Sequence, residues 1–314
     1  MAKATIKKKT KETITPTKAA KRVEVLKTYK IYIGGQFPRT ESGRYYIAKN
    51  NKGDILANVC LSSRKDFRDA VQKARSSFGG WSGKSAFNRS QILYRIAEML
   101  EGRRSQFVDE LMKQDATKTQ AEAEVDLSID RLIYYAGWCD KFQQMFGTVN
   151  PVASAHFNFS VPEPTGVVAA IASQKTSLLG LVSVIAPVIA GGNTIIILAS
   201  ETKPLCSVTF AEVLNSSDVS GGVVNILTGK SSELATYFAE HMDVNAIIYC
   251  DDDIATKKIL QEKASLNVKR VILYSDVNWS NEDKSQSPYF IMDTQEIKTT
   301  WHPIELIGGA KAGY

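Results

Sequence analysis

Cysteine and histidine are scarce in this 314-residue sequence, and neither shows the spacing of a structural site. The four cysteines stand far apart along the chain, at Cys60, Cys139, Cys206 and Cys250. This scatter predicts no disulfide framework and fits the reducing environment of the cytoplasm. The three histidines have no ligand spacing either, so we predict no metal site; they are His156, His241 and His302.

Long apolar runs are lacking as well. No stretch of about 18 apolar residues is free of interruption, which argues against a transmembrane helix. The N-terminus has no apolar core of the kind found in signal peptides. These absences predict a cytoplasmic protein without a membrane partner.

The net charge of +6 is concentrated at one end of the chain. Residues 1–28 hold nine Lys/Arg and two Asp/Glu, a net charge of +7, so the remainder carries about −1. We predict that residues 1–28 form a basic disordered tail. A solvated tail is favoured over an arm that contacts nucleic acid. Residues 305–314 show no structural pattern, and we treat them as a C-terminal tail.

Residues 166–274 alternate β-branched runs with stretches of helix length. The strand-like runs are residues 166–172, 193–198, 222–229, 246–249 and 268–274, and residues 177–190 form an apolar helix pattern. Continuous apolar strands separated by helices are typical of a parallel sheet covered on both faces. The fold class is therefore α/β, with a Rossmann-like parallel sheet and flanking helices.

Residues 29–150 contain a hairpin and a helical segment that we expect to pack on the Rossmann-like domain. Strand patterns occur at 30–37, 44–48 and 55–61. Ser63 with Asp66 has capping-box spacing for a helix through Ala74, and Gly79 and Gly80 are expected to break it. Apolar residues recur every three or four positions in two further helices, 86–114 and 121–146, and their apolar faces are expected to cover the sheet.

Two later segments have the pattern of exposed strands. Residues 156–161 alternate between polar and apolar side chains, and residues 289–301 do something similar. We assign strands of a small β arm to residues 151–165 and 288–304. Residues 275–287 are polar and unpatterned, so we predict a linker there.

Several motifs resemble those of aldehyde dehydrogenases in order and spacing. Thr165-Gly-Val-Val, Ala190-Gly-Gly-Asn-Thr, Gly222-Val-Val-Asn-Ile-Leu-Thr-Gly and His241-Met-Asp-Val-Asn resemble the NAD-binding domain of that family. Tyr32-Ile-Gly-Gly-Gln-Phe and Ala136-Gly-Trp-Cys-Asp-Lys are similar to its N-terminal segment, and Lys298-Thr-Thr-Trp-His-Pro to its closing strand. The resemblance covers about residues 28–304.

The resemblance implies that the catalytic domain is absent. Family members carry a separate domain with the cysteine nucleophile between the last Rossmann strand and the closing strand. Here only fourteen residues join Tyr274 to Tyr289, and all four cysteines lie in regions that match other domains. Acyl transfer needs an activated thiolate beside oxyanion donors. The general-base Glu of the family aligns with Tyr274, so we predict no catalytic residue.

The family's cofactor motifs are altered too. Lys175 stands where the family has the Asn of Pro-Trp-Asn. Leu198-Ala-Ser-Glu201 stands where the family has Lys-Pro-Ala-Glu, so only Glu201 is kept. The candidate cleft residues are Ser173, Lys175, Leu198, Glu201, Asp251 and Asp252. Two carboxylates in place of the family's Gly-Ser repel a diphosphate, so no bound cofactor is expected. Helix capping is favoured for Asp251 to Asp253 over a metal site. A nucleophile or Schiff-base role is disfavoured for Lys175, because no acid–base neighbour is in view.

The resemblance also implies an oligomerisation arm, because the strand before the Rossmann domain and the closing strand form one in the family. Seven arm residues are candidate interface residues: Phe157, Phe159, Val161, Phe290, Ile291, Met292 and Trp301. An arm without its own catalytic domain leaves strand edges and apolar side chains uncovered. A full-length aldehyde dehydrogenase subunit would cover them in a hetero-oligomer.

The whole pattern is similar to the non-catalytic C-terminal half of the two-domain, family 16 type of aldehyde dehydrogenase. The first hypothesis is a pseudoenzyme, a catalytically inactive subunit that stabilises or regulates an active NAD(P)-dependent aldehyde dehydrogenase. NAD or NADP would then be bound by the partner subunit. The alternative is a residual NAD(P)-binding protein or an oxidoreductase component of the family. The motifs leave open whether the chain is an enzyme, and they favour the hypothesis that it is not.

Overall fold

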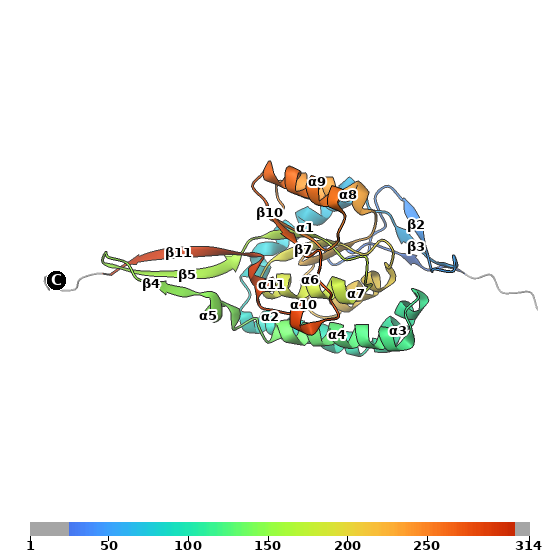
Figure 1. The fold of residues 1–314 in the computed structure, drawn as a ribbon, viewed down its shortest axis with the longest axis horizontal. Helices are drawn as coiled ribbons and strands as arrows, with labels where there is room; N and C mark the ends of the chain where they lie inside the picture. Colours follow the sequence, from blue (N-terminus) through green and yellow to red (C-terminus); the bar gives the residue numbers. More distant parts are fainter. Residues whose placement is uncertain (1–24, 305–314) are drawn as a thin grey trace, which may run out of the picture.

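The computed structural model describes residues 25–304 (Figure 1). The disordered tail predicted for residues 1–28 lies outside the described residues except for its last four, and the C-terminal tail lies outside them entirely. The tail ends earlier than predicted, because Thr28 already belongs to β1 (Thr28–Tyr29). This short strand pairs in parallel with β3 (Ile55–Cys60).

A five-stranded parallel sheet forms the centre of the molecule and confirms the predicted fold class. Its strands are β6 (Val167–Ile171), β7 (Thr194–Leu198), β8 (Val224–Leu227), β9 (Ala246–Tyr249) and β10 (Arg270–Leu273). Their spatial order is β10-β9-β6-β7-β8. Every residue of the first four strands is buried, which is the reason for their continuous apolar sequences.

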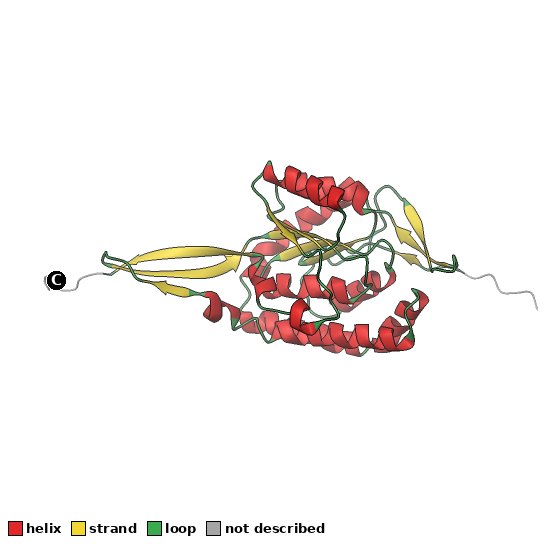
Figure 2. Ribbon diagram, in the orientation of Figure 1, coloured by secondary structure: helices red, strands yellow, loops and turns green. Residues whose placement is uncertain are grey.

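Helices cover both faces of this sheet, as Figure 2 shows. One face carries α6 (Leu179–Ala190) and α7 (Leu205–Asn215). The other carries α1 (Arg64–Ser82), α8 (Ser231–Glu240) and α9 (Ile254–Ser265). All residues of α6 are buried, because a further layer of helices packs on its outer side.

The outer layer departs from the sequence expectation in two ways. The predicted helix 86–114 is two helices, α2 (Ala86–Glu101) and α3 (Arg104–Lys113). The predicted helix 121–146 is also two, α4 (Lys118–Ala136) and α5 (Phe142–Phe146). Glycine ends the first of each pair, with the N–H of Gly102 or Gly137 bonded to the preceding turn. The apolar faces of α2 to α4 pack on α6 and α7 instead of the sheet.

The capping box predicted for α1 is confirmed. The Ser63 hydroxyl accepts from the N–H of Asp66, and the Asp66 carboxylate accepts from the N–H of Ser63. The predicted end before Gly79 and Gly80 is wrong. The helix runs on to Ser82 because Trp81 is fully buried and its indole N–H donates to the Ile189 carbonyl at 3.0 Å. This tertiary anchor outweighs the low helix propensity of two glycines.

The N-terminal hairpin consists of β2 (Tyr45–Lys49) and β3, which are antiparallel. The strand predicted for residues 30–37 is wrong, because that segment makes only isolated bridges around a Gly34-Gly35 turn. Both glycines have positive φ, 62° and 81°, which glycine adopts without steric cost.

A three-stranded arm extends from the body at the end opposite the hairpin (Figure 1). It contains β4 (Thr148–Asn150), β5 (His156–Pro164) and β11 (Gln295–Pro303) in the order β11-β5-β4. The strand predicted for residues 289–301 is wrong in its first part. Tyr289–Met292 forms the short helix α11, and α10 (Glu282–Ser285) precedes it.

Candidate functional site

The carboxyl ends of β6 and β9 mark the point where the strand order reverses. The chain moves from β6 to β7 and β8 on one side and then returns to β9 and β10 on the other. Open α/β sheets bind ligands in the crevice outside such a switch point. The candidate site is therefore made by the loop after β6, residues 172–178, and the loop after β9, residues 250–253.

The two loops of this crevice contact each other directly. Lys175 Nζ lies 3.5 Å from Asp252 Oδ2, and the N–H of Gln174 donates to Asp251 Oδ1 at 3.4 Å. Lys257 of α9 is 3.8 Å from the other oxygen of Asp252. Burial raises the pKa of the Asp251 carboxyl above its ordinary value. The carboxylates at this edge do not fit a diphosphate, which needs backbone N–H groups and positive charge there.

Gln174 fills the neighbouring space between the ends of β6 and β7. Its side-chain oxygen accepts from Glu201 N at 2.8 Å, Ser200 Oγ at 3.2 Å and Thr202 N at 3.3 Å. The candidate residue Glu201 thus contributes its backbone N–H to this contact. The sequence analysis assigned Gln174 no role. The one signal that could have indicated it as a site residue was its position next to Lys175.

Ser173 and Leu198 lie differently from the other candidate cleft residues. Ser173 is buried, and its hydroxyl accepts from the N–H of Lys175 at 3.2 Å. Leu198 is the last residue of β7 and packs inside the sheet core. Placing Leu198 in the cleft was wrong, because the alternation of β7 turns its side chain toward α1 and α8.

The three aspartates after β9 have two different roles. Asp253 is the N-cap of α9 and accepts from the Thr256 N–H at 2.8 Å and its hydroxyl at 2.6 Å. Capping is therefore confirmed for Asp253, whereas Asp251 and Asp252 contact the loop after β6. Nowhere in residues 25–304 do three or more His, Cys, Asp or Glu side chains gather as metal ligands would.

Tyr274, at the end of β10, is buried and donates a hydrogen bond to Asp293 Oδ2 at 2.6 Å. Burial and the nearby Asp293 carboxylate raise the pKa of the Tyr274 phenol. A phenol held in its protonated form serves as a hydrogen-bond donor. It cannot act as a general base near neutral pH.

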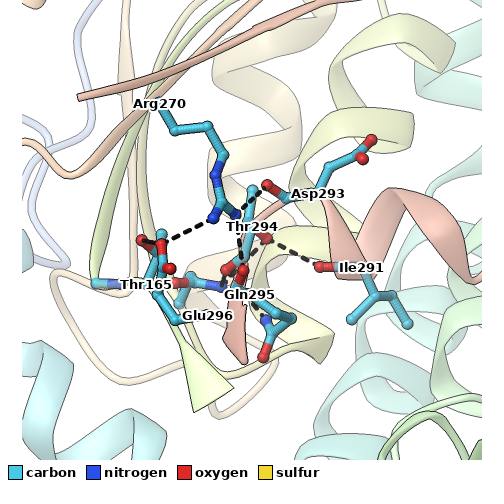
Figure 3. Close-up of polar contacts among 9 residues, drawn as sticks. Thr165, Arg270, Ile291, Asp293, Thr294, Gln295 and Glu296 are labelled. Carbon is cyan, nitrogen blue, oxygen red and sulfur yellow. Dashed lines mark hydrogen bonds and ion pairs between the residues drawn. The ribbon is translucent and has the colours of Figure 1, made fainter. Parts of the chain in front are cut away.

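A polar network joins the end of the sheet to the start of the arm (Figure 3). The Arg270 guanidinium donates to the carbonyls of Asp293 at 2.9 Å and Gln295 at 2.7 Å, and to Glu296 Oε1 at 2.9 Å. The Thr165 hydroxyl donates to the same carboxylate oxygen at 3.0 Å. β10 and β11 are thereby held together where the chain leaves the sheet.

The connection between β10 and β11 is folded, so the linker predicted for residues 275–287 is packed instead of loose. Trp279 and Ser285 are buried, and Arg131 of α4 binds both. Its guanidinium donates to the Trp279 carbonyl at 3.2 Å, to Ser285 Oγ at 2.9 Å and to the Ser285 carbonyl. Among the described residues, this connection contains only the two four-residue helices α10 and α11.

All four cysteines are buried and unpaired, as predicted. Burial raises the pKa of the Cys139 thiol to about 12, and it also raises the pKa values of Cys206 and Cys250. A thiol with a raised pKa is a poor nucleophile at neutral pH. Within residues 25–304, no helix has the length and apolar content needed to span a bilayer.

The arm has two different faces. Phe157, Phe159 and Val161 alternate along β5 and line an open groove of about 360 Å³ together with Val149. Trp301 lies on the opposite face, because it pairs with Asn158 in the antiparallel register. Phe157 is 46% exposed and Trp301 is 57% exposed.

The other three candidate interface residues are not part of the arm. Phe290, Ile291 and Met292 belong to α11, which packs against α6. Ile291 is 0% exposed, and the Phe290 ring lies 4.9 Å from that of Tyr274. Their assignment to an exposed strand was wrong, since the apolar side chains of this turn complete the core of the body.

The family model described as "Aldehyde dehydrogenase family" matches residues 38–278. The chain belongs to the aldehyde dehydrogenase family. It is 32% identical over 265 residues to the cytosolic 10-formyltetrahydrofolate dehydrogenase of Mus musculus, covering 82% of this chain and 29% of that protein. It is 30% identical over 251 residues to the putative aldehyde dehydrogenase DhaS of Bacillus subtilis, covering 78% and 50%.

Solved aldehyde dehydrogenase structures resemble this one over the same part of the chain. The NAD+ complex of the Bacillus cereus enzyme superimposes with a TM-score of 0.74 at 25% identity, covering 79% of this chain and 50% of that one. PnpE from Pseudomonas sp. WBC-3 gives 0.75 at 26% identity, covering 79% and 51%. This aldehyde dehydrogenase family member thus spans about half the length of these structures.

The family match includes the crevice and Tyr274 but ends at residue 278. The packed connection and β11 follow that point. Most of the segment that Arg131 and Arg270 hold in this aldehyde dehydrogenase family chain therefore lies beyond the matched residues.

Proposed function

We propose that this chain is a catalytically inactive aldehyde dehydrogenase-like subunit that associates with an active NAD(P)-dependent aldehyde dehydrogenase and stabilises or regulates it. The observation that carries the proposal is the connection from β10 to β11. It consists of two short helices packed on α4 and α6, in the place where the resemblance calls for the domain with the nucleophile.

The crevice supports the inactive role. Lys175 pairs with Asp252 across the switch point, and Gln174 fills the adjacent space. Tyr274 stands in the position of the family's general base, and its hydroxyl donates a hydrogen bond to Asp293. In this proposal the chain holds no cofactor of its own, and NAD or NADP is bound by the partner.

The arm supports association with a partner subunit. Its groove exposes Phe157 and Val149, and exposed apolar patches with unpaired strand edges are typical of interaction sites. The partner proposed is a full-length aldehyde dehydrogenase, whose sheet would continue that of the arm. A cytoplasmic location is part of the proposal and agrees with the name of one relative above, the cytosolic 10-formyltetrahydrofolate dehydrogenase.

Co-expression with a full-length aldehyde dehydrogenase from the same genome tests the proposal. Native mass spectrometry should detect a hetero-oligomer, and Phe157→Glu should reduce its amount severalfold. The matched control is Ile55→Glu, because Ile55 is half exposed on the β2–β3 hairpin, at the end of the molecule opposite the arm (Figure 1). A chain that stays monomeric with every such enzyme, or a complex that Phe157→Glu leaves intact, contradicts the proposal.

A residual NAD(P)-binding role is the second candidate. It is favoured by the intact parallel sheet and by the likeness to structures solved with NAD+. Calorimetric titration of the purified chain with NAD and NADP distinguishes the two. Micromolar binding that Asp252→Asn strengthens would favour this candidate, and no binding up to millimolar concentrations would remove it.

A further inference from the structure

We propose that a cavity beside the crevice binds a small phosphorylated molecule. The cavity has a volume of about 680 Å³ and lies between the tip of the β2–β3 hairpin, the connection from α3 to α4, and the loops that follow β6 and β7. Its volume is in the usual range for small-molecule sites, which is about 300–1,000 Å³. The proposal goes beyond the subunit function above and does not depend on it.

Three lysines supply the positive charge of this cavity: Lys49 from the hairpin, Lys175 after β6 and Lys203 after β7. Lys203 Nζ donates to the backbone carbonyl of Lys175 at 2.9 Å, which fixes its ammonium between the two loops. Among the side chains that the structure describes, no carboxylate lies within 4.0 Å of the ammonium of Lys49 or Lys203. Both lysines are available to an anionic ligand, and lysine binds phosphate as a point charge.

The two acidic residues of the cavity wall are already bound to backbone N–H groups. Glu124 Oε1 accepts from Ser177 at 3.0 Å, Leu178 at 2.8 Å and Leu179 at 3.2 Å, at the start of α6. Asp115 Oδ2 accepts from the N–H of Asn51 at 2.7 Å. These hydrogen bonds hold both carboxylates in place but do not remove their charge. The cavity wall therefore carries three ammonium groups against two carboxylates, which leaves an excess of positive charge for a ligand.

One wall of the cavity is apolar, with Ala116 just before α4 and Ala123 and Leu127 on the first half of that helix. Inorganic phosphate would leave this wall uncovered. An organic phosphate with a flat or partly apolar body would place its phosphate near the lysines and its body against Leu127. The Thr176 hydroxyl accepts from the Gly180 N–H at 2.9 Å and can donate its own proton to a phosphate oxygen, whereas the Thr202 hydroxyl already donates to the Gln174 carbonyl at 3.2 Å. The geometry therefore favours a mononucleotide or a sugar phosphate.

Isothermal titration calorimetry with the full chain tests this site. The probes are AMP and glucose 6-phosphate, each compared with its uncharged counterpart, adenosine or glucose. At least one phosphate ester should bind while its counterpart does not. Lys49→Gln combined with Lys203→Gln should weaken that binding by at least about tenfold, because two charge-assisted contacts are lost. Raising the salt concentration should also weaken it.

Lys52→Gln is the matched control, because Lys52 lies on the same hairpin and does not line the cavity. All of these lysines are on the surface, and circular dichroism will establish that the variants are folded. The proposal fails if neither phosphate ester binds at millimolar concentration, if adenosine or glucose binds as tightly as its phosphate, or if the double variant binds like the unaltered chain.

Discussion

Tyr274 and Asp293 are joined by a 2.6 Å hydrogen bond that ties the end of the parallel sheet to the start of the arm. Tyr274 directly follows β10, and Asp293 precedes β11 by two positions. The bond holds the two ends of the β10–β11 connection together. The position that the resemblance gives to a general base thus has a structural role in this chain.

Tyr274→Phe should lower the free energy of unfolding by about 1–2 kcal/mol, because a buried hydrogen bond is lost and the carboxylate keeps its partial burial. Urea unfolding followed by fluorescence measures the change. Tyr289→Phe is the control, since the Tyr289 side chain is largely exposed. Equal stability of the two variants would contradict the structural role of Tyr274.

Arg131→Met should release the connection from the body. Arg131 is 1% exposed and binds the Trp279 carbonyl and two oxygens of Ser285. Its loss leaves buried acceptors without a donor, at a cost of about 3 kcal/mol or more. Hydrogen exchange measured by mass spectrometry should become faster for residues 275–287.

The matched control for that experiment is Arg95→Met on α2, where the arginine is at the surface beside Glu98. It should leave the free energy of unfolding close to that of the unaltered chain, because an exposed ion pair contributes little to stability. Unchanged exchange of residues 275–287 in Arg131→Met would mean that the connection is held by other contacts.

Glu124→Ala should destabilise the start of α6. The carboxylate accepts from three successive N–H groups there and lies at the positive end of the helix dipole. A loss of roughly 1–2 kcal/mol is expected, as for an N-cap. Glu122→Ala on the same helix is the control, because its carboxylate lies at the surface and makes a 3.9 Å ion pair with Lys118. Thermal unfolding of both variants makes the comparison, and equal melting temperatures would contradict the cap.

Glu110 should give the protein a pH-dependent stability. It is 5% exposed, its Oε1 accepts from Tyr29 and Thr209 at 2.8 Å, and Oε2 has no partner within the described part of the chain. Burial raises the pKa of the Glu110 carboxyl above its ordinary value of 4.5. The folded protein therefore keeps this proton at pH values where the unfolded chain has released it.

It follows that the free energy of unfolding should fall as the pH rises above 4.5 through the folded pKa. Glu110→Gln removes this titration, so the stability of the native chain relative to the variant should decrease over the same interval. Urea unfolding at a series of pH values measures the difference. A difference that is constant with pH would show that the carboxyl has an ordinary pKa.

The parallel sheet could be predicted because its strands are buried on both faces, which demands continuous β-branched sequences such as residues 194–198. The capping box at Ser63 could be predicted because it depends on two residues three positions apart. Among the candidate site residues, the pairing of Lys175 with Asp252 could not be derived. It depends on β6 and β9 being neighbours, although 77 residues separate the two side chains.

The segment from Tyr289 to Met292 shows why local pattern was insufficient. Four successive large apolar residues are compatible with a strand or with one helical turn. The helical turn forms because it allows the buried Ile291 to pack against α6. In the same way, residues 275–287 are polar enough for a linker, and tertiary contacts of the buried Arg131 and Trp279 make them part of the body.

The sequence by itself determined the α/β class, the buried strands and the first cap of α1, because these depend on residues close together in the chain. The tertiary structure decided which loops close the crevice, where α1 ends and how the chain passes from β10 to the arm. Those outcomes depend on contacts between distant residues such as Trp81 and Ile189 or Tyr274 and Asp293. The energy of such contacts exists only when the whole fold is assembled.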